Sequence, residues 1–262
     1  MKAETNRSDF TPENEVVVVV PVYRQNPGPE ELEVFEHNCR ILKNHKIALA
    51  APEGLNIDEY KTNIDFDVEF FPPHFFQNIA GYNKLMLSEE FYSRFKLYKY
   101  MLICQTDVFV FKDDLENWCR KGYDYVGAPW IGKPFFLFQY VLAKMGFGYA
   151  IKLLFENNLK KAVGNGGFSL RKISAFIGAL EQNQLVKEWT ANEDFYWSFF
   201  AKSNGTKLLK PLANEAAFFC IELAPEKLMK QQNHVLPMGI HAWKRYNPEF
   251  WVKYINMSLE ND

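Results

Sequence analysis

The chain has 262 residues, of which 48% are hydrophobic and 16% aromatic, and its formal net charge is −2. This length and composition suffice for one sizeable hydrophobic core. The near-neutral charge argues against a general nucleic-acid-binding protein, which usually carries a marked excess of Lys and Arg.

Four cysteines, Cys39, Cys104, Cys119 and Cys220, form no CxxC pair or zinc pattern, so we expect free thiols in a reducing compartment.

Two segments bear on location. Residues 1–14 are polar and lack the apolar core of a signal peptide, which predicts a flexible lead-in and a cytoplasmic protein. Residues 134–155 form the most apolar long stretch, but polar residues interrupt it before the length of a spanning helix is reached. The segment is compatible with a packed or amphipathic helix pair. It is also compatible with an interfacial segment or lid that contacts the inner face of a membrane or a lipid-linked substrate.

The first half of the chain alternates predicted strands and helices. The run VVVVV, which ends at Pro21, is typical of a strand buried on both faces of a parallel sheet. The alternation predicts an α/β fold, in which ligands bind beyond the carboxyl ends of the strands. The predicted elements are a strand from residue 15, a helix over 29–44, strands over 46–52 and 67–73, a helix over 81–95 and a strand over 100–111.

The second half is less regular. Helices are predicted over residues 172–182 and 192–203, between loop-like segments rich in glycine and aromatic residues. No linker or internal repeat interrupts the chain. We therefore expect a single domain over residues 15–255, with a nucleotide-binding half (15–112) and an acceptor or sugar half (113–255).

Asp107 stands in the apolar stretch YMLICQTDVFVF. A carboxylate in an apolar strand is costly unless it is paired or bound to a cation. It could cap a helix or pair with a buried Arg. We favour a metal ligand at a strand end, because a divalent cation that bridges two phosphates needs only one or two protein carboxylates.

The segment GNGGFSLRK, from Gly164 to Lys172, has three glycines in four positions. It matches neither a Walker loop nor GxGxxG. The glycines are compatible with a tight turn that enters a strand, or with a loop whose backbone approaches a ligand.

Two further segments carry candidate groups. In NEDFYW, Asn192 is a possible N-cap, and the acidic Glu193 and Asp194 either favour the helix dipole or supply one general base. In GIHAWKRY, His241 is either a structural histidine or, with the cations that follow it, part of a metal and diphosphate site.

In this order, VVVVVPVYR, QTD, GNGGFSLRK, NEDFYW and HAW resemble the nucleotide-sugar-dependent glycosyltransferases of the GT-A fold. The resemblance covers roughly residues 15–250. It is greatest to a bacterial family of glycosyltransferase-like proteins described as a domain of unknown function. It implies a mixed, mostly parallel Rossmann-type sheet flanked by helices, in which QTD stands where the family pattern has DxD.

The motifs and the resemblance together give the candidate site residues. The donor-site candidates are Pro21, Val22, Tyr23, Arg24, Lys84, Gln105, Thr106, Asp107 and Lys244. The candidates for a sugar or acceptor pocket are Trp130, Asn165, Gly166, Gly167 and Trp243, the metal ligands are Asp107 and His241, and the catalytic bases are Asp194 and Glu193. Gln105 replaces the first acid of DxD, which weakens the expectation of a Mn²⁺ or Mg²⁺ cofactor, while Asp107 keeps the position that usually contacts the metal.

The resemblance implies transfer of a sugar from a nucleotide-sugar donor to a saccharide or lipid-linked acceptor, in bacterial polysaccharide or lipopolysaccharide assembly. Inversion is favoured because a carboxylate is available as the base. Two alternatives stay open. One is a nucleotidyltransferase, although PVYRQNPGPEE is a poor match to its basic glycine loop. The other is a non-catalytic carbohydrate- or nucleotide-binding protein on the same fold.

Overall fold

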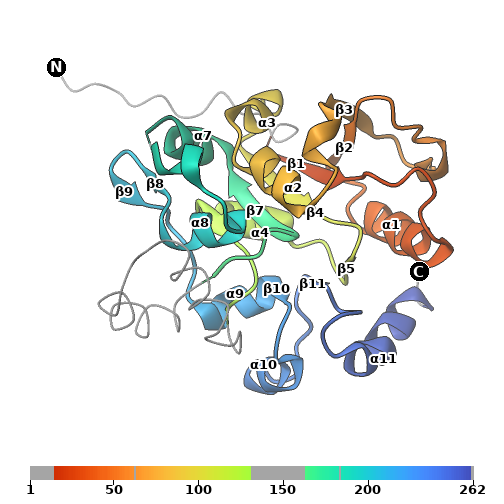
Figure 1. The fold of residues 1–262 in the computed structure, drawn as a ribbon. Coiled ribbons are helices and arrows are strands. Elements are labelled where there is room, and N and C mark those ends of the chain that lie inside the picture. Colours follow the sequence, from red (N-terminus) through yellow and green to blue (C-terminus); the bar gives the residue numbers. More distant parts are fainter. Residues whose placement is uncertain (1–14, 62, 131–162, 183, 261–262) are drawn as a thin grey trace.

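The computed structural model describes residues 15–61, 63–130, 163–182 and 184–260 (Figure 1). The predicted lead-in of residues 1–14 and the apolar segment of residues 134–155 lie outside the described residues. Within the ranges that the structure describes, no helix is long and apolar enough to cross a membrane.

The centre of the fold is a six-stranded mixed sheet. Its strand order is β3-β2-β1-β4-β7-β6; β1 to β4 run parallel, and β7 is antiparallel to both of its neighbours. The strands are β1 (Val16–Pro21), β2 (Lys46–Pro52), β3 (Asp67–Phe71), β4 (Tyr100–Cys104), β6 (Tyr125–Val126) and β7 (Phe168–Lys172). The predicted α/β fold with a mixed, mostly parallel sheet is confirmed.

Strand β1 occupies the position where the strand order reverses. It pairs with β2 on one side and with β4 on the other, and Val19 lies opposite both Ala48 and Ile103. Ligands of such sheets bind in the crevice beyond the carboxyl ends of the two diverging strands. Here β1 ends at Pro21 and β4 ends one residue before Gln105, so two groups of candidate donor residues leave the sheet at the same edge.

Helices cover both faces of the sheet (Figure 1). The valines of β1 are at most 5% exposed because alternate side chains enter two different hydrophobic clusters. On one face lie α1 (Pro29–Ile41) and α4 (Leu115–Arg120); on the other lie α2 (Ile79–Met86), α3 (Glu89–Arg94), α7 (Ile173–Gln182) and α8 (Glu193–Phe199).

Two predicted elements are interrupted. The single helix expected over residues 81–95 is two helices, because Ser88 ends one and begins the next: its Oγ donates to the Leu85 carbonyl at 2.8 Å and accepts the Phe91 N–H at 3.3 Å. The strand expected over residues 100–111 breaks at Gln105–Asp107, after which the chain continues as β5 (Val108–Val110) in another sheet.

This second sheet has the order β10-β11-β5 and lies below the main sheet in Figure 1. Its strand β5 pairs antiparallel with β11, and Val108 lies opposite His241. The remaining elements are β10 (Cys220–Ile221), β11 (Gly239–His241), α9 (Ala213–Phe219), α10 (Pro225–Gln231), α11 (Pro248–Leu259), the hairpin of β8 (Lys202–Ser203) and β9 (Thr206–Lys207), and the 3₁₀ helices η2 (Asp58–Tyr60), η3 (Pro73–Phe75) and η4 (Gln184–Glu188). The helix predicted over 192–203 therefore ends at Phe199.

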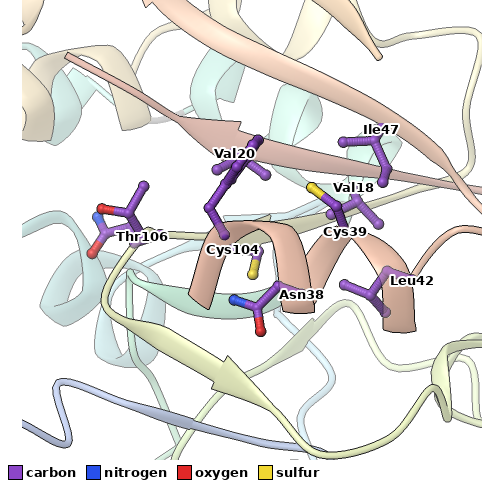
Figure 2. Close-up of a pocket in the computed structure, with 10 residues that line it drawn as sticks. Val18, Val20, Asn38, Cys39, Leu42, Ile47, Cys104 and Thr106 are labelled. Carbon is purple, nitrogen blue, oxygen red and sulfur yellow. The ribbon is translucent and has the colours of Figure 1, made fainter. Parts of the chain in front are cut away.

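A small cavity lies beneath α1, against β1 and β4 (Figure 2). Its wall includes Val18, Cys39, Cys104 and Thr106, and its volume of ≈ 10 Å³ has room for about one water molecule. A nucleotide cannot bind there. All four cysteines are free, as predicted, and all four are buried.

Candidate functional site

The glycine loop of residues 164–167 is the point where the other motifs meet. A β-carbon on Gly167 would overlap His241 Nε2 and come within 2.6 Å of Gln105 Oε1, and one on Gly166 would overlap Glu193 Oε1. These two glycines are required by close approach and not by a left-handed backbone. The structure therefore brings together the QTD, NED and HAW segments around two adjacent glycines.

The start of this loop is packed against α8. A β-carbon on Gly164 would overlap Ser198 Oγ and come within 2.7 Å of Trp130 Nε1. Trp130 is buried, with ring contacts to Phe195 and Phe199. Trp130, a predicted pocket residue, thus belongs to the packed wall between the loop and α8.

Asn165 fixes the loop and the histidine together. Its Oδ1 accepts the backbone N–H of Gly167 at 2.8 Å and of Phe168 at 3.2 Å, and its Nδ2 lies 2.8 Å from His241 Nδ1. The two N–H donors orient the amide, so Nδ2 faces the ring as a donor. Asn165 is 1% exposed and contacts the site through His241.

Asp107, His241 and Glu222 form a row of alternating charge. Asp107 Oδ1 is 3.3 Å from His241 Nε2, and Glu222 Oε1 is 3.7 Å from His241 Nδ1. The side chain of Asp107 is half-exposed, whereas those of His241 and Glu222 are largely buried. The row leads from the protein interior to the open edge of the sheet.

The pKa values of Asp107 and His241 shift in opposite directions. Burial raises the pKa of Asp107, but His241 and, more weakly, Lys244 lower it by more than burial raises it. The net pKa of Asp107 therefore lies below the ordinary value. Burial lowers the pKa of His241, and the carboxylates of Asp107 and Glu222 more than offset this and raise it. The Asn165 NH₂ group opposes protonation of Nδ1 and limits the rise, because two donors would then face each other.

The Asp107–His241 pair fits a divalent cation. Adjacent ligands of an octahedral ion with bonds of 2.0–2.1 Å lie about 3 Å apart, close to the 3.3 Å found here. His241 Nε2 is buried, and the polar group that lies against it is the Asp107 carboxylate. Coordination through Nε2 would place the ring proton on Nδ1, where Glu222 could accept it and from which the Asn165 amide would have to turn away.

Asp107 and His241 are the two candidate side-chain ligands of such a cation. In residues 15–61, 63–130, 163–182 and 184–260, no cluster of three or more His, Cys, Asp or Glu side chains is arranged to hold a metal. A cation at Asp107 and His241 would therefore depend on ligands from a bound molecule or water.

The two acidic residues of the NED segment occupy different environments. Glu193 is 2% exposed, and its Oε1 lies 3.2 Å from Arg171 Nη2. Burial raises the pKa of Glu193 to about 7; Arg171 opposes this rise and Asp194 adds to it. Asp194 is only partly buried, and its β-carbon would lie 3.9 Å from a β-carbon on Gly166. Asn192 stands at the N-cap position without a side-chain cap; instead Asn83 Oδ1 accepts the Glu193 N–H at 3.2 Å.

The candidates at the end of β1 lie at the same edge. Pro21 and Val22 are buried, whereas Tyr23 is 53% exposed. Arg24 lies over the Tyr23 ring and pairs with Glu31 at 2.8 Å. An exposed aromatic and a cation at the end of the first strand are compatible with contacts to a base and a phosphate.

The remaining candidates are more scattered. Lys244 pairs with Glu30 at 2.9 Å and also lowers the pKa of Asp107, so it borders the row. Thr106 is partly buried in the turn before Asp107. Lys84 is exposed on α2. Trp243 is 6% exposed and belongs to the cluster that contains Trp251, and Lys244 Nζ lies over its ring.

Sequence reasoning missed three residues that build the site, which are Asn83, Arg171 and Glu222. Arg171 carried one signal, since a charged residue in a strand of apolar neighbours must find a buried partner. Asn83 and Glu222 act across long sequence separations and carried none.

A family model described as "Protein of unknown function (DUF5672)" matches residues 65–241. The chain belongs to this family. The matched region contains the QTD, glycine-loop and NED segments and ends at His241. No curated protein has a matching sequence.

The solved structures that resemble the chain include several glycosyltransferases. The WbbM bifunctional glycosyltransferase has a TM-score of 0.51 at 13% identity, over 90% of this chain and 47% of that one, so the chain spans about half the length of WbbM. The galactosyltransferase LgtC, solved with donor and acceptor sugar analogs, gives 0.46 at 13% identity over 86% of each chain. Core-mannan synthase A from Aspergillus fumigatus, solved in a Mn/GDP form, gives 0.43 at 11% identity over 79% of this chain and 72% of that one. The likeness to WbbM establishes a shared fold.

Proposed function

We propose that the chain is a glycosyltransferase that uses a nucleotide-sugar donor. The observation that carries the proposal is the convergence of three motifs on Gly166 and Gly167. Gly167 borders His241 and Gln105, and Gly166 borders Glu193 and Asp194. A sugar held against these glycines would lie between a histidine–carboxylate pair and a second carboxylate. This is the arrangement that glycosyl transfer requires.

Glycosyl transfer has two chemical demands. The leaving nucleoside diphosphate must be stabilised, and the acceptor hydroxyl must lose its proton. In the proposal Asp107 and His241 serve the first demand, with Lys244 as a nearby cation. A Mn²⁺ or Mg²⁺ ion held by Asp107 and His241 would supply positive charge to the diphosphate.

Asp194 is the proposed base. It is partly exposed and lies beside Gly166, whereas Glu193 is buried and paired with Arg171. A base must come within hydrogen-bond reach of the proton that it removes. Asp194 and the Asp107–His241 pair border different glycines of the loop, and in the proposal they act on different parts of the bound sugar. Inversion of the anomeric carbon is proposed because a carboxylate is available as the base.

The finer parts of the proposal concern donor and acceptor. Tyr23 and Arg24 would contact the nucleoside at the end of β1, and the glycine loop would shape the sugar pocket. The acceptor would be a saccharide or a lipid-linked glycan in bacterial polysaccharide or lipopolysaccharide assembly, on the cytoplasmic side of the membrane. These parts rest on the sequence resemblance.

The proposal is tested by turnover. The purified chain is incubated with uridine, guanosine and thymidine diphosphate sugars and a mixture of saccharide acceptors, with and without Mn²⁺. Release of nucleoside diphosphate, together with a mass increase of one acceptor, is the expected result. Release of pyrophosphate from a nucleoside triphosphate and a sugar phosphate would instead establish a nucleotidyltransferase. Donor binding without turnover in the presence of a broad acceptor panel would favour a non-catalytic binding protein.

A further inference from the structure

Arg171 is a fully buried cation in β7, which lies between β4 and the edge strand β6 of the main sheet. It lies in β7, opposite Met101 of β4 and Tyr125 of β6, and its side chain is 0% exposed. Removing a charge from water costs several kcal/mol unless it is paired and hydrogen-bonded. The contacts of Arg171 must therefore offset a large penalty.

Those contacts join four parts of the fold. Nε donates to Ser169 Oγ at 2.9 Å on its own strand, and Nη1 donates to Tyr92 Oη at 2.7 Å on α3. Nη2 contacts both the Gly166 carbonyl at 3.3 Å and Glu193 Oε1 at 3.2 Å. One guanidinium nitrogen thus connects the glycine loop to the first residue of α8.

The loop and α8 are also in direct contact. Gly166 has no side chain where Glu193 Oε1 lies, so the loop backbone sits against this carboxylate. The next residue, Gly167, accepts the Gln105 N–H at 2.8 Å and borders His241. A shift of Gly166 would therefore move both the Asp107–His241 edge and the surroundings of Asp194.

We propose that Arg171 is a positioning residue that fixes Gly166 and Gly167 against the first turn of α8. Its consequence for catalysis rests on the proposed function: Arg171 keeps the base Asp194 in register with the diphosphate side of the site. It does so through Glu193 and the loop carbonyl, without touching the substrate.

The geometry requires arginine. Its planar group presents five donors in a fixed fork, and its three nitrogens make four contacts here with groups in different directions. Lysine keeps the charge but has a single nitrogen, so it cannot reach Tyr92, Gly166 and Glu193 together. Arg171→Lys therefore separates charge from positioning.

The first test compares Arg171→Lys with Lys172→Met, a change in the next residue, which makes a more exposed ion pair with Asp124. Hydrogen exchange is measured at the backbone amides of Asn165, Gly167 and Phe168. The Asn165 N–H donates to Tyr125 Oη, and the other two donate to Asn165 Oδ1. We expect faster exchange at these amides in Arg171→Lys, without a change in β1 or β2, and wild-type exchange in Lys172→Met. The turnover number should fall by about 100-fold, with a smaller change in KM for the donor. Both acidic residues remain in this variant, so the loss does not come from removal of a base.

A second variant guards against misfolding. Arg171→Met/Glu193→Leu replaces the buried pair by apolar side chains, a change that is often neutral or stabilising. We expect a folded protein with rapid exchange in the glycine loop. Wild-type loop exchange in either folded variant would overturn the proposal. Failure of the double variant to fold would also overturn it, because Arg171 and Glu193 would then be needed for folding itself.

The outcome is separable from that of the proposed function. Hydrogen exchange needs no donor, so it tests the positioning role even if the wild type has no sugar-transfer activity. Absence of turnover in the wild type would contradict the proposed function alone.

Discussion

Asp107 Oδ1 lies 3.3 Å from His241 Nε2 because β5 and β11 pair antiparallel with Val108 opposite His241. Asp107 and His241 are far apart in the sequence, so this contact depends on the tertiary fold. The short sheet of β10, β11 and β5 brings Asp107 and His241 together. The glycine loop, which leads into β7, lies against His241 through Gly167. A carboxylate at the end of a parallel strand thereby gains a partner that no local pattern supplies.

The first prediction concerns metal binding and pH. His241 must lose a proton to coordinate a cation through Nε2, and its pKa is raised, so protons compete with the metal below that pKa. Mn²⁺ affinity should therefore increase as pH rises, by up to about tenfold per unit. Titration of Mn²⁺ by electron paramagnetic resonance between pH 6 and 8 measures this. Affinity that is independent of pH would show that His241 is not a ligand. Glu222→Gln, which removes one group that raises the pKa, should move the rise in affinity to lower pH.

The second prediction concerns the close approach of the loop. Gly167→Ala would place a β-carbon where His241 Nε2 and Gln105 Oε1 lie. Overpacking of this kind costs about 1–3 kcal/mol of unfolding free energy, and donor binding should weaken because the histidine must move. Gly28→Ala is the control, since nothing lies within 4 Å of a β-carbon there. Thermal unfolding and donor calorimetry on both variants check the prediction. Equal thermal stability and equal donor affinity of the two variants would contradict the close contact between Gly167 and His241.

The third prediction assigns the base. Asp194→Asn should lower turnover by a factor on the order of 10²–10⁴, because the amide cannot take a proton from the acceptor. Donor affinity and thermal stability should stay near the wild-type values, since Asp194 is partly exposed and borders Gly166, whereas His241 borders Gly167. Steady-state kinetics with donor and acceptor provide the measurement. A variant with full turnover would remove Asp194 from the mechanism.

The fourth prediction separates Glu193 from its neighbour. Glu193→Ala leaves Arg171 as a buried charge without its anionic partner, which should cost about 3–5 kcal/mol of unfolding free energy. Chemical denaturation of Glu193→Ala and Asp194→Ala compares the two positions directly. We expect the large loss only for Glu193. Similar small losses would contradict the description of Glu193 as one half of a buried ion pair.

The sequence predicts the four parallel strands of the main sheet because local signals suffice there, but it did not predict β6 and left β7 open. The valine run of β1 is buried on both faces, and the strands from Lys46, Asp67 and Tyr100 begin where their apolar residues begin. Helix boundaries were less predictable. Ser88 divides one expected helix, since a serine side chain can serve as a cap as readily as it can face solvent.

The site was predictable as a set of segments and not as a set of contacts. The QTD turn, the glycine loop and His241 do come together, yet Asn165 is an internal anchor and Trp243 packs in the core. Glu193, at the start of α8, proved to be buried and paired with Arg171 of β7. Such roles depend on pairings between distant parts of the chain, which periodicity and spacing do not encode.

The most direct test of the account is calorimetry of nucleotide-sugar donors with and without Mn²⁺, on the wild type, Asp107→Ala and Asp113→Ala. Asp113 is a matched control, because it pairs with His45 at 2.8 Å away from the glycine loop. We predict that the wild type and Asp113→Ala bind one class of nucleoside diphosphate sugar more tightly with Mn²⁺, and that Asp107→Ala loses this gain, by at least about tenfold or 1.4 kcal/mol. Identical binding by Asp107→Ala and the wild type, or no binding of any donor by the wild type, would contradict the proposed donor site.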